Sequence, residues 1–111
     1  MKINIKALSI NKAFKGRRFK TQDYKDYEQE AFYLLSNDVI IPDGNLELYL
    51  EVGLSSKLAD LDNIAKLWID ILQKRFCFND RRIYKLLMIK KIVKKGDEYI
   101  TFNFKEYVEN K

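Results

Sequence analysis

Three aspartates and one lysine have the residue types and spacing needed for metal-assisted chemistry on a phosphate: Asp60, Asp62, Asp80 and Lys66. The 111-residue chain contains no histidine, which excludes a Ser-His-Asp or Cys-His nucleophile and a histidine-bound zinc. Acid–base or metal chemistry must therefore come from carboxylates. Magnesium prefers hard oxygen ligands and completes its shell with water and substrate phosphate, so two or three aspartates would supply the protein's share.

Each of these aspartates also has an ordinary structural interpretation. Asp60 would cap a helix, Asp62 would complement the positive end of the helix dipole, and Asp80 would occupy a turn. Lys66 lies four residues after Asp62, and an exposed ion pair at that spacing contributes only about 0.2–0.5 kcal/mol. The residues alone leave both interpretations open.

Positive charge is concentrated on both flanks of the aspartates. The chain has 21 Lys and Arg against 16 Asp and Glu, a net charge of +5. Residues 11–20 carry five basic side chains and no acid, and residues 81–95 carry seven. Carboxylates bordered by cations suit a protein that binds a phosphate backbone and places a divalent cation on it. The residues expected to contact the backbone are Lys12, Lys15, Arg17, Arg18, Lys20, Arg81 and Arg82.

Hydrophobic periodicity predicts the elements that position these residues. It predicts strands over residues 1–7, 46–54, 82–94 and 99–104, and helices over residues 21–36 and about 60–75. Lys95-Gly96-Asp97 is the expected turn of a hairpin between the last two strands, and residues 11–20 are expected to form an exposed loop. The order β-α-β-α-β-β predicts an α+β fold, a single small domain in which two helices pack on a mixed β-sheet.

Composition favours the cytoplasm. The single cysteine, Cys77, cannot form an intramolecular disulfide, which favours a reducing compartment. No window approaches the roughly 20 apolar residues that span a bilayer, and the first residues alternate with Lys and Asn, so neither a membrane partner nor a signal peptide is expected. We expect one domain over residues 1–111, without an organic cofactor.

Three segments together resemble a known protein family. They are Asp60-Leu61-Asp62-Asn63-Ile64-Ala65-Lys66, the helix that carries Asp70, and Phe78-Asn79-Asp80-Arg81-Arg82-Ile83. The family is that of the RusA-like Holliday junction resolvases, small nucleases often encoded by bacteriophages. Its members share an Asp-Leu-Asp-Asn segment, a lysine four residues after the second Asp, a short amphipathic helix and a further Asp before a strand. The N-terminal region matches more loosely: Asn11 is present, but the family's prolines before it and the arginines before Asp60 are missing.

The resemblance implies that Asp60, Asp62 and Asp80 bind a catalytic metal, Mg²⁺ or Mn²⁺, with Lys66 as the active-site lysine. It further implies a homodimer whose two sites nick paired strands of a branched DNA, the four-way junction, in recombination and repair. The protein would then act in the cytoplasm, that of a bacterial host if a phage encodes it. Two other functions stay open, a metal-dependent nuclease for other branched DNA and a non-catalytic nucleic-acid-binding protein.

Overall fold

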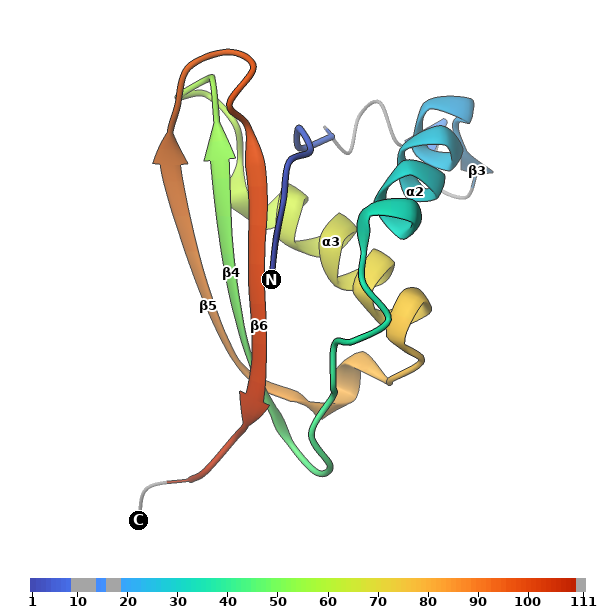
Figure 1. The fold of residues 1–111 in the computed structure, drawn as a ribbon, viewed down its shortest axis with the longest axis vertical. Helices are drawn as coiled ribbons and strands as arrows, with labels where there is room; N and C mark the ends of the chain where they lie inside the picture. The colour runs from blue at the N-terminus through green and yellow to red at the C-terminus, as the bar shows by residue number, and fades with distance from the viewer. Residues whose placement is uncertain (9–13, 16–18, 110–111) are drawn as a thin grey trace.

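A four-stranded mixed sheet forms one layer of the molecule, and both helices lie on the same side of it (Figure 1). The structure is a computed structural model that describes residues 1–8, 14–15 and 19–109. The sheet has the order β1-β6-β4-β5 and the helices are α2 and α3. The bounds are β1 (Lys2–Ile3), α2 (Gln22–Leu34), β4 (Leu46–Leu54), α3 (Leu61–Phe76), β5 (Ile83–Ile92) and β6 (Tyr99–Glu106). The predicted α+β architecture and its element order are confirmed.

The basic N-terminal stretch differs in part from its expected loop conformation. It contains a small two-stranded antiparallel sheet made of β2 (Phe14–Lys15) and β3 (Phe19–Lys20). Residues 9–13 and 16–18, which include Lys12, Arg17 and Arg18, lie outside the described residues. The first predicted strand, over residues 1–7, is shorter than expected and covers Lys2–Ile3.

Strand β4 is an inner strand, paired with β6 on one side and β5 on the other, and its alternating apolar side chains all face the helices. Leu46, Leu48, Leu50 and Val52 have no exposed surface. The polar side chains between them alternate onto the opposite face of the sheet, which the helices leave uncovered (Figure 1). The sequence pattern predicted this strand with its observed bounds.

The connection from β4 to β5 is a helical crossover. The two strands are parallel and pair from Leu46 opposite Ile83 to Leu54 opposite Ile92, with one register shift between Leu46 and Glu47. Parallel neighbours need a crossover rather than a tight turn, and α3 provides it. Its buried residues form one face of the helix: Ile64, Ala65, Leu67, Trp68, Ile71 and Leu72. A 16-residue helix is about 24 Å long, so its two ends are far apart.

The hairpin expected between the last two strands does not form, and that prediction was wrong. A turn does occur, since the Asp97 N–H donates to the Lys94 carbonyl at 2.9 Å. However, β5 and β6 flank β4 on opposite sides. Pairing with β4 places Ile100 and Phe102 of β6 opposite buried β4 residues and buries both almost completely, which a place at the sheet edge would not do.

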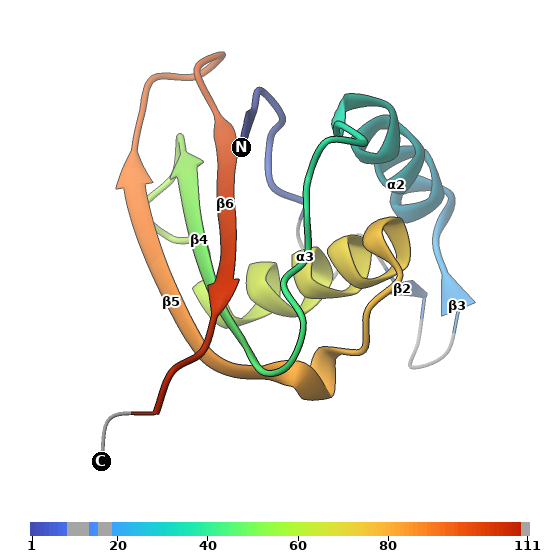
Figure 2. The ribbon, with the colours of Figure 1, turned by 60° about the horizontal axis from the view of Figure 1, so that its bottom comes forward.

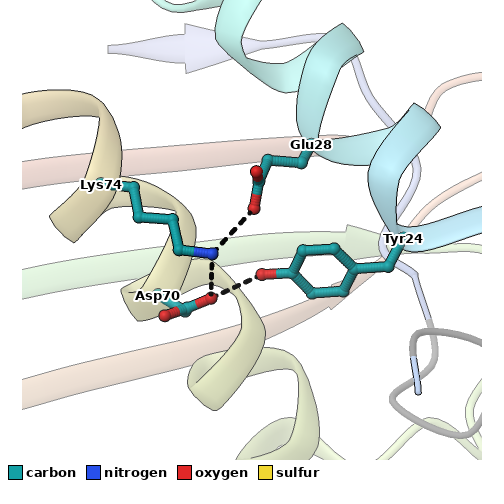
Figure 3. A network of polar contacts seen from close by, with 4 residues as sticks. All are labelled: Tyr24, Glu28, Asp70 and Lys74. Atoms are coloured by element: carbon teal, nitrogen blue, oxygen red, sulfur yellow. Dashed lines mark hydrogen bonds and ion pairs between the residues drawn. The ribbon is translucent and has the colours of Figure 1, made fainter. Parts of the chain in front are cut away.

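A polar network fixes α2 against α3 (Figure 3). The Tyr24 hydroxyl donates to Asp70 at 2.6 Å, and the Lys74 ammonium lies 3.3 Å from carboxylate oxygens of both Asp70 and Glu28. Tyr24 is 1% exposed, and burial together with Asp70 raises the pKa of its hydroxyl. Thr21 caps the same helix by accepting from the Tyr24 N–H, as the sequence predicted.

Replacing Tyr24 with Phe should therefore weaken the contact between the helices. The change removes a hydrogen bond to a charged carboxylate, and we expect the free energy of unfolding to fall by about 1–2 kcal/mol. Tyr33→Phe, on the same helix but 89% exposed, is the matched control and should change it by less than about 0.5 kcal/mol. Urea unfolding followed by Trp68 fluorescence measures both. Equal stability of the two variants would contradict the role of the network.

Candidate active site

The Asp60 carboxylate lies at the start of α3 but does not cap it. Asp60 occupies the N-cap position, and its side chain makes no capping hydrogen bond and is exposed. Thr21 and Asn79, at the corresponding positions of α2 and of the short 3₁₀ helix η1 (Asp80–Arg82), do accept such bonds. The structural interpretation of Asp60 as a cap is therefore not supported, and its carboxylate is available to a ligand.

Asp62 and Lys66 follow on the first two turns of α3, and both side chains are exposed. No ion pair between them is found in the described part of the chain. The positive end of the helix dipole favours anionic side chains here. The structure thus brings Asp60, Asp62 and Lys66 to the same end of one helix, as the sequence predicted.

A pocket of about 300 Å³ opens beside Asp60. Its polar lining includes Lys6, Asn63 and Glu98. Glu98 is 9% exposed and accepts hydrogen bonds from the Ser55 hydroxyl at 2.9 Å and the Gly96 N–H at 2.7 Å. The pKa of this carboxyl is lowered by hydrogen bonds from the backbone N–H of Glu98 itself, from the Ser55 hydroxyl and from the Gly96 N–H, so it carries negative charge. Sequence reasoning missed Glu98, because only the fold brings it to this pocket.

The carboxylates on the uncovered face of the sheet are already engaged by neighbouring strands. Glu47 forms an ion pair with Lys105 at 3.0 Å. Glu51 accepts hydrogen bonds from the hydroxyls of Tyr49 and Tyr99, both at 2.6 Å, and this contact raises the pKa of Tyr99 to about 12. These acids therefore stabilise the sheet, in contrast to the two aspartates at the start of α3.

Asp80 lies at the opposite end of the β4–α3–β5 unit from Asp60. It begins η1, which follows the end of α3 and precedes the first residue of β5 (Figure 2). The residue before Asp60, Ala59, is bound through its carbonyl to Lys90 near the other end of β5. Lys90 lies seven positions after Ile83 along the strand, a distance of about 23 Å. No group of three or more His, Cys, Asp or Glu among the described residues could hold a metal ion. One chain therefore does not bring the three predicted aspartates together.

The two arginines after Asp80 differ in their contacts. The Arg82 guanidinium donates to the carbonyl oxygens of Gly44, at 2.8 Å, and Pro42. It thus fastens η1 to the loop before β4, a structural role that sequence reasoning did not foresee. Arg81 is exposed. The sequence predicted that both arginines, together with Lys15 and Lys20 of the small sheet, contact a phosphate backbone. These contacts stay predictions.

The exposed carboxylates at the start of α3, in a chain of net charge +5, suit a protein that acts on a phosphate backbone. A family model for the endodeoxyribonuclease RusA matches residues 6–101. The chain therefore belongs to the RusA family, and it is an endodeoxyribonuclease that hydrolyses DNA phosphodiester bonds and acts on Holliday junctions. RusA-like resolvases are metal-dependent nucleases, and the matched range contains all three predicted aspartates. A search of curated proteins gives no match to this chain. None of the described helices is both long and apolar enough to cross a membrane.

Because Asp60 makes no capping bond, replacing it with Asn should leave the stability nearly unchanged. We expect Asp60→Asn to alter the free energy of unfolding by less than about 0.5 kcal/mol. Thr21→Ala removes a bond that does cap a helix and should lower it by about 1 kcal/mol. Urea unfolding at pH 7 compares the two variants. A loss for Asp60→Asn as large as that for Thr21→Ala would show that the carboxylate has a capping role after all.

Proposed function

We propose that the protein is a magnesium-dependent Holliday junction resolvase that nicks paired strands of a four-way junction, as a homodimer, in recombination and repair. The observation that carries this proposal is the exposed pair Asp60 and Asp62 at the start of α3, with Lys66 one turn further on. One RusA-like domain would span residues 1–111. It would act in the cytoplasm, in a bacterial host if a phage encodes it.

The donor chemistry at the start of α3 fits a hard divalent cation. Asp60 and Asp62 offer carboxylate oxygens, the ligands that Mg²⁺ prefers, and Mn²⁺ accepts the same set. Asp80 is proposed as the third metal-binding carboxylate. The cation, when bound, polarises the scissile phosphate and makes the attacking water more acidic. Without it, two carboxylates about 4 Å apart would repel each other by about 4 kcal/mol at an effective dielectric constant near 20.

Lys66 would act directly on the substrate. Its ammonium lies one turn beyond Asp62 on the same helix face and is exposed. There it would bind a phosphate oxygen and stabilise the negative charge that grows on the phosphate during bond cleavage. No histidine is needed for this chemistry.

The basic residues predicted from the sequence would bind the DNA backbone. They are Lys12, Lys15, Arg17, Arg18, Lys20, Arg81 and Arg82. Contacts of this kind release counterions, so the affinity for the junction should fall steeply with salt concentration. Arg82 would combine such a contact with its bonds to the loop before β4.

A dimer would bring the third carboxylate to the other two. Strand β5 is an edge strand of the sheet, since the described residues place β4 on one side of it and no strand on the other. It also exposes large apolar side chains, and an exposed apolar edge favours pairing with another strand. These side chains are Tyr84, Leu86, Leu87 and Ile92, which are 42–61% exposed.

Antiparallel pairing of two β5 edges about a two-fold axis would place the start of the partner's strand near the end of this one. Asp80 precedes the start of β5, whereas the loop before Asp60 contacts Lys90 near the end of that strand. In the antiparallel dimer, Asp80 of the partner subunit would therefore approach Asp60 and Asp62. Each dimer would then contain two metal sites, each built from both chains. Paired nicking requires such a two-fold arrangement.

Substitution of the aspartates should separate cleavage from binding. Asp60→Asn, Asp62→Asn and Asp80→Asn should each abolish Mg²⁺-dependent cleavage of a mobile four-way junction, while junction affinity stays within about threefold because the basic residues remain. Asp97→Asn, in an exposed turn, is the control and should cleave normally. Chelation of Mg²⁺ with EDTA should likewise stop cleavage and leave binding intact.

Flaps, linear duplex and RNA serve as competing substrates in the same assay. Preferred cleavage of a flap would favour a nuclease for other branched DNA. Binding without any product under Mg²⁺ or Mn²⁺ would favour a non-catalytic nucleic-acid-binding protein. Retained cleavage by Asp60→Asn would reject the assignment of that carboxylate.

A mixed dimer tests whether the site is shared between chains. Subunits carrying Asp60→Asn and Asp80→Asn, with different tags, are co-expressed and the heterodimer is isolated. If each site combines the two chains, one site of the heterodimer has both substitutions and the other has none, so the heterodimer should nick one strand although both homodimeric variants are inactive. A completely inactive heterodimer would contradict a shared site.

A further inference from the structure

We infer that Lys90 is a positioning residue that holds the loop before Asp60 and thereby sets the place of the Asp60 carboxylate; the inference rests on the proposed role of Asp60 in cleavage. Lys90 lies on β5, thirty residues after Asp60, and it does not belong to the aspartate motif. Its ammonium contacts the polypeptide backbone of the loop that joins β4 to α3.

The ammonium of Lys90 bridges two carbonyl groups of this loop. It donates to the Lys57 carbonyl at 2.9 Å and to the Ala59 carbonyl at 3.1 Å. An ammonium has three donors and can therefore bind both oxygens at once. Ala59 immediately precedes Asp60, so the bond fixes the peptide from which the Asp60 backbone continues into α3.

The loop has few other attachments among the described residues. Ser55 at its start donates to Glu98, and within it the Leu58 N–H donates to the Ser56 hydroxyl at 3.2 Å. Leu58 is 92% exposed and does not anchor the loop by packing. Ala59 packs partly against the core, and among the described residues Lys90 supplies the side-chain hydrogen bonds that tie the second half of the loop to the sheet.

The direction of the Lys90 side chain is unusual for a basic residue of this strand. Lys90 pairs with Val52, whose side chain is fully buried on the helix side of the sheet. The adjacent Lys91 pairs with Gly53, and because side chains alternate along a strand it lies on the opposite, uncovered face. A lysine on the apolar side of the sheet is explained by the two carbonyl oxygens that it reaches there.

Loss of this contact should affect the catalytic step more than DNA binding. A misplacement of about 1 Å in a catalytic group can lower the rate about a hundredfold. We expect Lys90→Met to lower kcat for junction cleavage by about 10–100-fold, with KM and junction affinity within about threefold. Lys90→Arg keeps a cation that can donate to both carbonyls and should recover most of the rate.

Lys91→Met is the matched control. It removes the same charge from the neighbouring residue of the same strand, but on the face away from the loop, and it should leave kcat within about twofold. The salt dependence of junction binding adds a readout: if Lys90 were a phosphate contact, Lys90→Met would weaken binding and lower the slope of log K against log salt by about 1. That result would overturn the inference.

Amide hydrogen exchange tests, independently of cleavage, whether Lys90 holds the loop before Asp60. Lys90→Met should speed exchange at Leu58, Ala59 and Asp60, while the interior of α3 keeps its protection and Lys91→Met changes neither. Unchanged exchange in the loop would overturn the inference. If Asp60→Asn still cleaves junctions but Lys90→Met loosens the loop, the proposed catalytic role of Asp60 is rejected, whereas the role of Lys90 in holding the loop is supported.

Discussion

The parallel pairing of β4 with β5 is the constraint on which the rest of the structure depends. Parallel neighbours require a crossover, and α3 fills it with a helix of about 24 Å. Its start and its end are therefore fixed at opposite ends of the same two strands. Asp60 and Asp62 are placed at one end and Asp80 at the other, and no adjustment of side chains within one chain can close that gap. The same pairing leaves β5 at the sheet edge with apolar side chains exposed, and this edge is where the proposed dimer would bring a second copy to complete the three carboxylates.

The two ends of α3 are held by different means. At its start, the preceding loop is tied to β5 by Lys90 and to the region after β5 through Ser55 and Glu98. Along its length, the network of Tyr24 and Asp70 joins it to α2. Beyond its end, Arg82 fastens η1 to the loop before β4. Hydrogen bonds to backbone carbonyls thus fix the segments that carry the aspartates, while the aspartates themselves stay exposed. The proposed metal site requires both a fixed backbone and exposed side chains, because its ligands must be held in place and still be accessible to the ion.

The sequence predicted what is local and missed what is long-range. The strand at Leu46–Leu54 and the helix that begins at Leu61 follow from periodicities that the chain itself encodes. The Asp60 motif was recognisable because its residues are neighbours on one helix. The place of β6 was not predictable, because alternation shows that a strand has an apolar face but not which partner covers it. Lys90 and Glu98 went unrecognised as parts of the Asp60 surroundings for the same reason, since only the sheet register brings them there.

Anomalous diffraction from crystals of the protein with a four-way junction and Mn²⁺ measures directly whether two chains share each metal site. Manganese occupies the same carboxylate sites as magnesium and gives a distinct signal. A metal site shared between two chains predicts one anomalous peak per chain, bounded by Asp60 and Asp62 and by Asp80 of the partner subunit. Manganese held away from the start of α3, or with no aspartate of the second chain near it, would contradict it.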